Sequence, residues 1–218
     1  MKKDYEKCKS LTFGICMLQF AIFFSGCAYQ AGSRIQPGRY ALFRGDAKAA
    51  LAHFQRAAEI DPDSAMRVGP MKEGVWTYVG RAHYASGDYK AAAKALEQAR
   101  SRHPDDYMAP LYLGLSLSRQ GDRSRGAKEI QTGLTGLGDW LDYINRYDLD
   151  GSYWDPGGYI RSEIKDSLDT IQGKEINWPQ LIASVEKVGI DFEREPDEVL
   201  RQKRRDRRDS SKGDDRGR

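Results

Sequence analysis

Paired carboxylates are the residues of this chain whose type and spacing come closest to acid–base catalysis. Asp105 and Asp106 are adjacent but lie in a loop-like stretch, where carboxylates are normally solvated. Asp155 and Glu163 form a second combination from which a hydrolase could be built. The sequence contains no Gly-x-Ser-x-Gly, His-Glu-x-x-His or phosphate-loop motif. We therefore expect a protein that is not an enzyme, with a cryptic hydrolase at Asp155 and Glu163 as the minor alternative.

Side chains that could hold a metal ion are equally sparse. The chain has three histidines: His53, His83 and His103. They are far apart in the sequence, and no cysteine–histidine cluster has the spacing of a zinc site. We expect neither a metal nor a cofactor.

The three cysteines, Cys8, Cys16 and Cys27, lie near the N-terminus. Several lysines follow Met1 and make the start of the chain basic. Residues 11–24 then form a mostly apolar run, which is too short to span a membrane but has the length of a signal-peptide core. The run ends in Ser25-Gly26-Cys27, which resembles the lipobox of bacterial lipoproteins. The resemblance implies that residues 1–26 are a lipoprotein signal peptide, that Cys27 carries lipid and that residues 27–36 are a tether. Ordinary secretion and a plain membrane anchor are the alternatives.

Lipidation at Cys27 would decide where the protein resides. Because Ala28, rather than aspartate, follows the cysteine, the resemblance implies sorting to the outer membrane, on its periplasmic face. Two or more acyl chains would anchor the protein stably. The mature chain would then have no cysteine thiol free to form a disulfide, so its fold would depend on packing alone.

A unit of 34 residues repeats in the middle of the chain. Gly80, Gly87 and Asp88 return as Gly114, Gly121 and Asp122. The register extends backwards to Gly45 and Asp46 with a shift of 42, so about eight extra residues lie within 64–74. A fixed period of this length indicates stacked helical repeats, in which glycine ends one helix and aspartate caps the next. We expect the insert to be a loop, with an extension of a neighbouring helix as the alternative.

The unit from Trp76 to Pro104 closely resembles a tetratricopeptide repeat (TPR). Its small residues at Gly80, Ala92 and Ala99 let two antiparallel helices approach closely. The resemblance implies an all-α fold: a short TPR-type α-solenoid over residues 37–140. About three helix-turn-helix repeats would make it up, at 37–63, 73–106 and 107–140, and Pro37-Gly38 would interrupt the first helix of the first repeat and leave it short.

In TPR proteins, a groove lined by the first helix of each unit binds peptides or partner proteins. The resemblance places six residues of this chain there: Thr77, Arg81, Tyr84, Leu111, Leu115 and Arg119. Because Arg81 and Arg119 would favour carboxylates, the implied partner is an envelope protein or peptide segment with apolar and acidic features.

Residues 141–194 are rich in aromatic residues and read as a helical C-terminal cap. Apolar residues at helical spacing predict helices around Ile160–Ile171 and from Trp178 onward. A cap would cover apolar surface at the end of the solenoid. The alternative is a small-molecule or glycan-binding site at Tyr153, Trp154 and Asp155.

The remaining residues, 195–218, are highly charged, and we expect a disordered tail after a short helical start. Electrostatic contact with anionic lipid headgroups is the alternative for this tail. Over the whole chain, 35 basic residues balance 32 acidic ones. Such a balance argues against a nucleic-acid-binding protein, which normally has a basic face.

Overall fold

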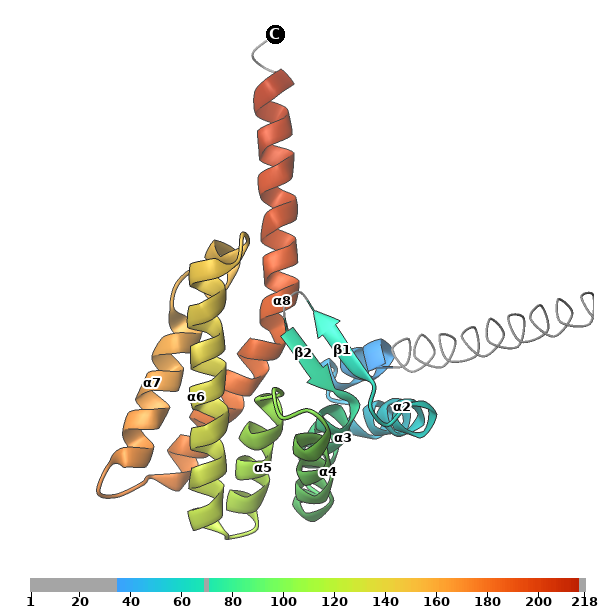
Figure 1. The fold of residues 1–218 in the computed structure, drawn as a ribbon, viewed down its shortest axis with the longest axis vertical. Coiled ribbons are helices and arrows are strands. Elements are labelled where there is room, and N and C mark those ends of the chain that lie inside the picture. Colours follow the sequence, from blue (N-terminus) through green and yellow to red (C-terminus); the bar gives the residue numbers. More distant parts are fainter. Residues whose placement is uncertain (1–34, 69–70, 216–218) are drawn as a thin grey trace, which may run out of the picture.

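The computed structural model describes residues 35–68 and 71–215. Residues 35–43 are helical. The elements that follow are α2 (Ala47–Ile60), β1 (Ala65–Val68), β2 (Met71–Gly74), α3 (Val75–Ala85), α4 (Tyr89–Arg102), α5 (Met108–Arg119), α6 (Arg123–Tyr147), the 3-10 helix η1 (Gly151–Tyr153), α7 (Tyr159–Gln172) and α8 (Trp178–Asp215). Helices dominate, packed side by side, and the end of α8 projects from the body (Figure 1). The expected all-α repeat fold is confirmed.

The turn inside each helix pair has the same structure three times. Its glycine adopts a positive φ at Gly45 (+78°), Gly87 (+81°) and Gly121 (+95°). The aspartate that follows caps the next helix by accepting a backbone N–H at 2.9–3.2 Å, at Asp46, Asp88 and Asp122. Since a left-handed residue is strained for side chains other than glycine, each turn fixes where one helix ends and the next begins.

Close helix contact also repeats, and it extends to the first unit. A Cβ atom on Gly80 would lie 2.4 Å from the side chain of Leu96, and one on Gly38 would lie 2.4 Å from the ring of Phe54. The expectation that Pro37–Gly38 interrupts the first helix is wrong, because residues 35–43 are helical throughout. Gly38 is the equivalent of Gly80, 42 residues earlier, and a larger residue there would displace Phe54 from the core.

The insert between the first two units is neither a plain loop nor a helix extension. It forms an antiparallel hairpin in which Ala65 pairs with Gly74 and Val68 with Met71. Glu73 on β2 is 1% exposed, so the hairpin brings a carboxylate into the interior. This hairpin was not predicted from the sequence, because two four-residue strands are too short to show a recognisable alternation of apolar and polar residues.

α6 is one helix of 25 residues that continues past residue 140, where the third unit was expected to end. A continuous buried stripe, including Leu137, Leu141 and Ile144, explains why it does not stop near Trp140. The helices α7 and α8 begin where the apolar spacing predicts them. Inward-facing residues of α8 pack in the same core as α5 and α6: Leu181, Ile182, Val185, Val188 and Phe192.

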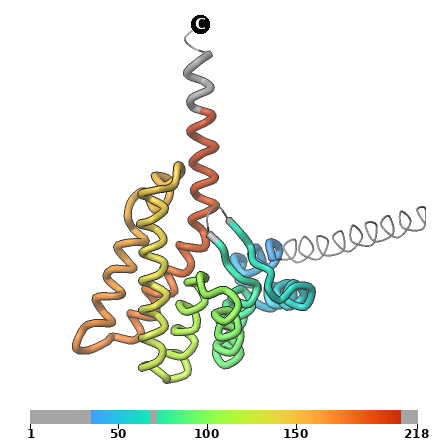
Figure 2. Tube along the Cα trace, viewed as in Figure 1, coloured from blue at the N-terminus to red at the C-terminus, as the bar shows by residue number. Residues whose placement is uncertain are grey.

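The charged end of the chain was expected to be disordered, but most of it is helical. In the structure α8 continues through Pro196 to Asp215, and it rises away from the other helices (Figure 2). Val199 is buried, and Lys203 forms an ion pair with Asp150 beside η1. Arginine, lysine and glutamine are good helix formers, so a helix that is packed at its start can continue through such a sequence.

Among residues 35–68 and 71–215, no helix combines the length and apolar character needed to cross a bilayer.

Candidate functional site

The candidate groove is the face lined by residues 35–43, α3 and α5, which are the first helices of the three units. α8 lies across this face. Its Glu193 bonds to Arg39 of the first helix and to Arg81 of α3. Against α5, Gly189 lies so close that an added Cβ would be 2.8 Å from Tyr112 Oη. The chain therefore fills much of its own groove with a helix that carries glutamates.

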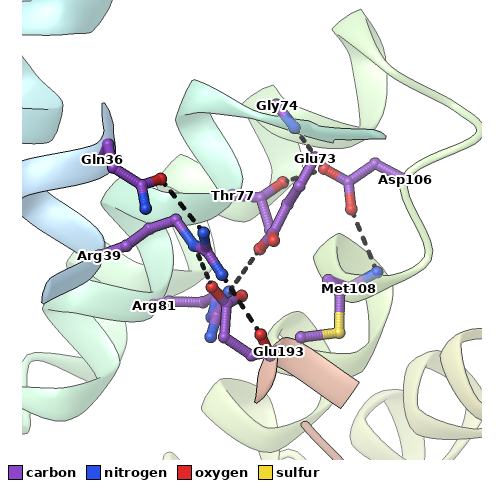
Figure 3. A network of polar contacts seen from close by, with 9 residues as sticks. All are labelled: Gln36, Arg39, Glu73, Gly74, Thr77, Arg81, Asp106, Met108 and Glu193. Atoms are coloured by element: carbon purple, nitrogen blue, oxygen red, sulfur yellow. Dashed lines mark hydrogen bonds and ion pairs between the residues drawn. The ribbon is translucent and has the colours of Figure 1, made fainter. Parts of the chain in front are cut away.

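A buried ion network holds α8 in this position (Figure 3). Arg81 Nη1 donates to Glu73 Oε1 at 2.6 Å and also to Glu193, while Arg39 donates to both the carboxylate and the backbone carbonyl of Glu193. All four side chains are at most 5% exposed. The guanidinium of Arg81 also lies 5.1 Å from the ring centroid of Tyr112. Three parts of the chain that are distant in sequence, namely the first helix, the adjoining β2 and α3, and α8, thus meet at one desolvated centre.

The two carboxyl groups of this network differ in ionisation. Burial raises the pKa of Glu73 to about 8, although Arg81 partly offsets the effect. Burial also opposes ionisation of Glu193, but the attraction of Arg81 and Arg39 outweighs it and lowers the pKa. Glu73 Oε2 finds no hydrogen-bond partner within the described part of the chain. Near neutral pH the network therefore holds two arginines, an ionised Glu193 and a mostly protonated Glu73.

A half-exposed contact lies seven residues earlier on α8. Glu186 accepts a hydrogen bond from Tyr84 and one from Arg119 at 2.8 Å. The side chains of Glu186 and Arg119 are 30% and 39% exposed. Burial and the Glu186 carboxylate raise the pKa of Tyr84, so its hydroxyl stays protonated. Solvent reaches this contact, unlike the buried network.

The other expected groove residues serve the fold. Thr77 donates to Asp106 Oδ2 at 2.6 Å, which ties α3 to the loop before α5. Leu111 and Leu115 are completely buried. Leu111 packs against α6, where an added Cβ on Gly133 would come within 2.6 Å of its backbone nitrogen. Of the six residues, Tyr84 and Arg119 remain accessible to a partner.

Arg39 was not predicted as a groove residue, although its position in the repeat register would have identified it. Arg39 precedes Arg81 by 42 residues, and Leu115 follows Arg81 by 34, so the three share one register position. Glu193, Glu186 and Glu73 lie outside the repeat, and no sequence signal identifies them as partners of these arginines.

A cavity of about 310 Å³ remains where α8 crosses the groove. Its walls combine apolar groups from four helices with charged side chains. The lining includes Leu42, Phe43, Tyr84, Tyr112, Ile190 and Arg194. Ile190 is 43% exposed, so the cavity is accessible from solvent. This arrangement can receive an apolar side chain and place an acidic neighbour beside Arg194.

The aromatic turn expected as an alternative ligand site has packing and capping roles. Trp154 is 2% exposed and meets Trp140 edge to face, with ring centroids 5.1 Å apart. Asp155 caps α7 by accepting the backbone N–H of Ile160 at 3.0 Å, and its carboxylate also pairs with Arg161 at 3.0 Å. A glycan would have to displace these contacts in order to stack on Trp154. These contacts favour the interpretation of residues 141–194 as a cap on the solenoid over that of a ligand site.

Tyr153, the remaining residue of the expected ligand site, is half-buried. Its hydrogen bond to Asp206 raises the pKa of its hydroxyl and joins the turn to α8.

The two carboxylates considered for a hydrolase are each engaged separately. Asp155 is the cap of α7, and Glu163 accepts a hydrogen bond from Ser184. Within the described ranges, no group of histidine, cysteine, aspartate and glutamate side chains is arranged to hold a metal ion. Cys27, residues 1–26, which were expected to be a signal peptide, and most of the expected tether at 27–36 lie outside the described residues.

Helix pairs with repeated glycine turns and close helix contacts define a helical-repeat protein. The family model described as Tetratricopeptide repeat matches residues 80–131, from the middle of α3 into α6. The protein therefore contains tetratricopeptide repeats, which generally bind protein partners and are typically not enzymatic. A search of curated proteins found no match to the chain.

Proposed function

We propose that this protein is a lipid-anchored scaffold of the bacterial cell envelope that docks a partner protein at the mouth of its repeat groove. The observation that carries the proposal is the cavity of about 310 Å³ beside α8. An apolar side chain of the partner would enter between Phe43 and Ile190, and an acidic neighbour would meet Arg194. Because Glu186 and Glu193 already satisfy the groove arginines, the partner binds next to α8 and does not replace it.

The groove part of the proposal is tested by photo-crosslinking in cells, with the full chain at native level. Phe43 lines the cavity, whereas Tyr40 on the same helix is 53% exposed and does not line it. We expect p-benzoylphenylalanine at position 43 to give one dominant protein adduct and the same probe at position 40 to give none.

Two matched substitutions sharpen this test. Ile190→Asp places a charge in the cavity wall, and Leu200→Asp makes the same change at a site on α8 with similar exposure, 48% against 43%. The adduct should be lost with Ile190→Asp and kept with Leu200→Asp. Arg81→Glu would be a poor variant, because Arg81 belongs to the buried network. Equal adducts in both variants would show that the cavity is not the docking site.

The envelope part of the proposal is supported by the N-terminal sequence. An apolar run ends in Ser25-Gly26-Cys27, and Ala28 follows. We expect an alkyne-tagged palmitate to label the protein in cells and the Cys27→Ser variant to lose the label. Cell fractionation should place the labelled protein in the outer membrane. Unchanged labelling of Cys27→Ser would contradict lipidation at this residue.

A further inference from the structure

The exposed face of α8 carries arginines at regular intervals. Arg194, Arg201 and Arg205 are exposed and are separated by seven and four residues, which correspond to two turns and one turn of an α-helix. Arg204, one turn after Arg201, is exposed on the same side. We call these four residues the arginine stripe. The proposed function uses only Arg194.

The packing of α8 fixes the direction in which the stripe faces. Phe192, Val199 and Lys203 have the same spacing, each two residues before an arginine of the stripe. Phe192 and Val199 are 1% and 5% exposed, and Lys203 pairs with Asp150 beside η1. Two residues along an α-helix correspond to a rotation of about 200°, so the stripe lies on the side of α8 that is turned away from the body. The last turns of α8 project beyond the other helices (Figure 1).

The chain itself offers these arginines little negative charge. Arg201 pairs with Glu198 at 2.7 Å, but the two side chains are 55% and 59% exposed, so the pair is solvated and weak. Arg194, Arg204 and Arg205 form no ion pair with any side chain that the structure describes. Most of the stripe is therefore available to a partner.

Positive charge is concentrated in residues 199–208, which contain six basic residues and one acidic residue. The acidic residue, Asp206, is engaged by a hydrogen bond with Tyr153. Since like charges one turn apart on a helix repel each other, a partner with carboxylates would stabilise this part of α8. Between this stretch and Arg194 the helix has three acidic residues, Glu195, Asp197 and Glu198. The stripe thus has one arginine at the cavity and a cluster on the projecting end.

We propose that the arginine stripe binds a run of acidic side chains in the partner protein whose apolar side chain enters the cavity beside α8. This inference rests on the proposed function. The stripe begins at Arg194, which lines the cavity, and Arg205 lies about 16 Å further along the helix. A partner segment that continues from the cavity along α8 would place its carboxylates against these guanidinium groups.

The composition of α8 favours a protein segment over the anionic surface of a membrane. A helix that binds in the membrane interface has an apolar face beside its basic one. No large apolar residue follows Leu200 in the chain, so the projecting end of α8 has no such face. Tetratricopeptide repeats, moreover, generally bind protein partners.

In solution, the purified full chain is titrated with a fluorescent peptide in which a phenylalanine is followed by glutamates. The control peptide has glutamine in place of every glutamate. We expect fluorescence anisotropy to show at least tenfold tighter binding of the glutamate peptide, and added salt to reduce this advantage. Equal affinities of the two peptides would overturn the proposal.

Matched variants locate the acidic contact. Arg204→Gln plus Arg205→Gln removes two charges from the stripe and should weaken binding of the glutamate peptide at least fivefold. Arg56→Gln plus Arg125→Gln removes the same charge from α2 and α6, at sites that are 60% and 58% exposed, and should leave the affinity unchanged. The same affinity in both double variants would mean that the stripe does not bind the carboxylates.

Crosslinking in cells separates this inference from the proposed function. With the probe at position 43, Arg204→Gln plus Arg205→Gln should reduce the adduct at least fivefold, and the control pair should keep it. An adduct that the stripe variant leaves unchanged would overturn the stripe but not the docking cavity. No adduct in the chain without these changes would overturn the proposed function, on which the inference rests.

A membrane surface is tested by flotation with vesicles of phosphatidylglycerol and phosphatidylcholine. The Cys27→Ser chain is used, so that no lipid on this residue contributes to binding. We expect no flotation that depends on Arg204 and Arg205. Flotation that is lost with Arg204→Gln plus Arg205→Gln would overturn the proposal in favour of anionic lipid.

Discussion

Glu193 and Glu186 lie seven residues apart on α8, and both bind arginines of the repeat groove, but in different surroundings. Glu193 and its partners Arg39 and Arg81 are at most 5% exposed, whereas Glu186 and Arg119 are 30% and 39% exposed. A buried charge that loses its partner cannot regain water, while an exposed one can. Glu193 pairs with two arginines and Glu186 with one arginine and Tyr84, and the difference in burial is the main reason to expect several-fold different effects on stability.

Removing the carboxylate of Glu193 should have the largest effect on stability. Glu193→Ala leaves Arg39 and Arg81 desolvated with one mostly protonated acid nearby, so we expect the free energy of unfolding to fall by about 3–5 kcal/mol. Urea denaturation measures this loss. The matched control is Glu198→Ala, at a 59% exposed site on the same helix, which should change stability by less than about 0.5 kcal/mol. Equal losses in the two variants would mean that α8 is not held by the network.

A pH titration should separate the two acids inside the network. In the unfolded chain Glu73 titrates near 4.5, and in the folded protein near 8. Between these values the folded state holds a proton that the unfolded state has released, so this contribution to stability falls as the pH rises. Glu193, whose pKa is lowered, stays ionised in this window.

We therefore expect wild type to have a lower urea midpoint at pH 8 than at pH 5.5, and Glu73→Gln to lose most of this difference. Glu59→Gln, at a 63% exposed site, should keep the wild-type difference. A midpoint that changes equally with pH in wild type and Glu73→Gln would show that Glu73 is ionised in the folded protein.

The smallest effect should come from the half-exposed contact. Glu186→Ala removes the acceptor of Tyr84 and Arg119, and water can replace it, so we expect a loss of about 0–1 kcal/mol. Raising the salt concentration should reduce this loss further. A loss as large as that of Glu193→Ala would contradict the ranking by burial. Together Glu193→Ala and Glu186→Ala measure how strongly the buried and the half-exposed parts of α8 are held on the repeats.

The repeat was readable from the sequence because its determinants are local. A glycine with positive φ followed by a capping aspartate needs only adjacent residues, and small residues such as Gly80 mark close contact between neighbouring helices. The same register contained Gly38 and Arg39, which were overlooked because Pro37 obscured the first helix. The hairpin at β1 and β2 was missed because its strands are too short to leave a pattern.

The sequence by itself determined the helical repeats, their turns, and the apolar stripes that begin α7 and α8. Only the tertiary structure decided that α8 lies across the groove and that Glu193 bonds to Arg39 and Arg81. The reason is distance along the chain: Arg39 and Glu193 are separated by 154 residues. Repeat spacing reports contacts between neighbouring units, whereas a buried ion pair between distant segments depends on how the whole chain packs.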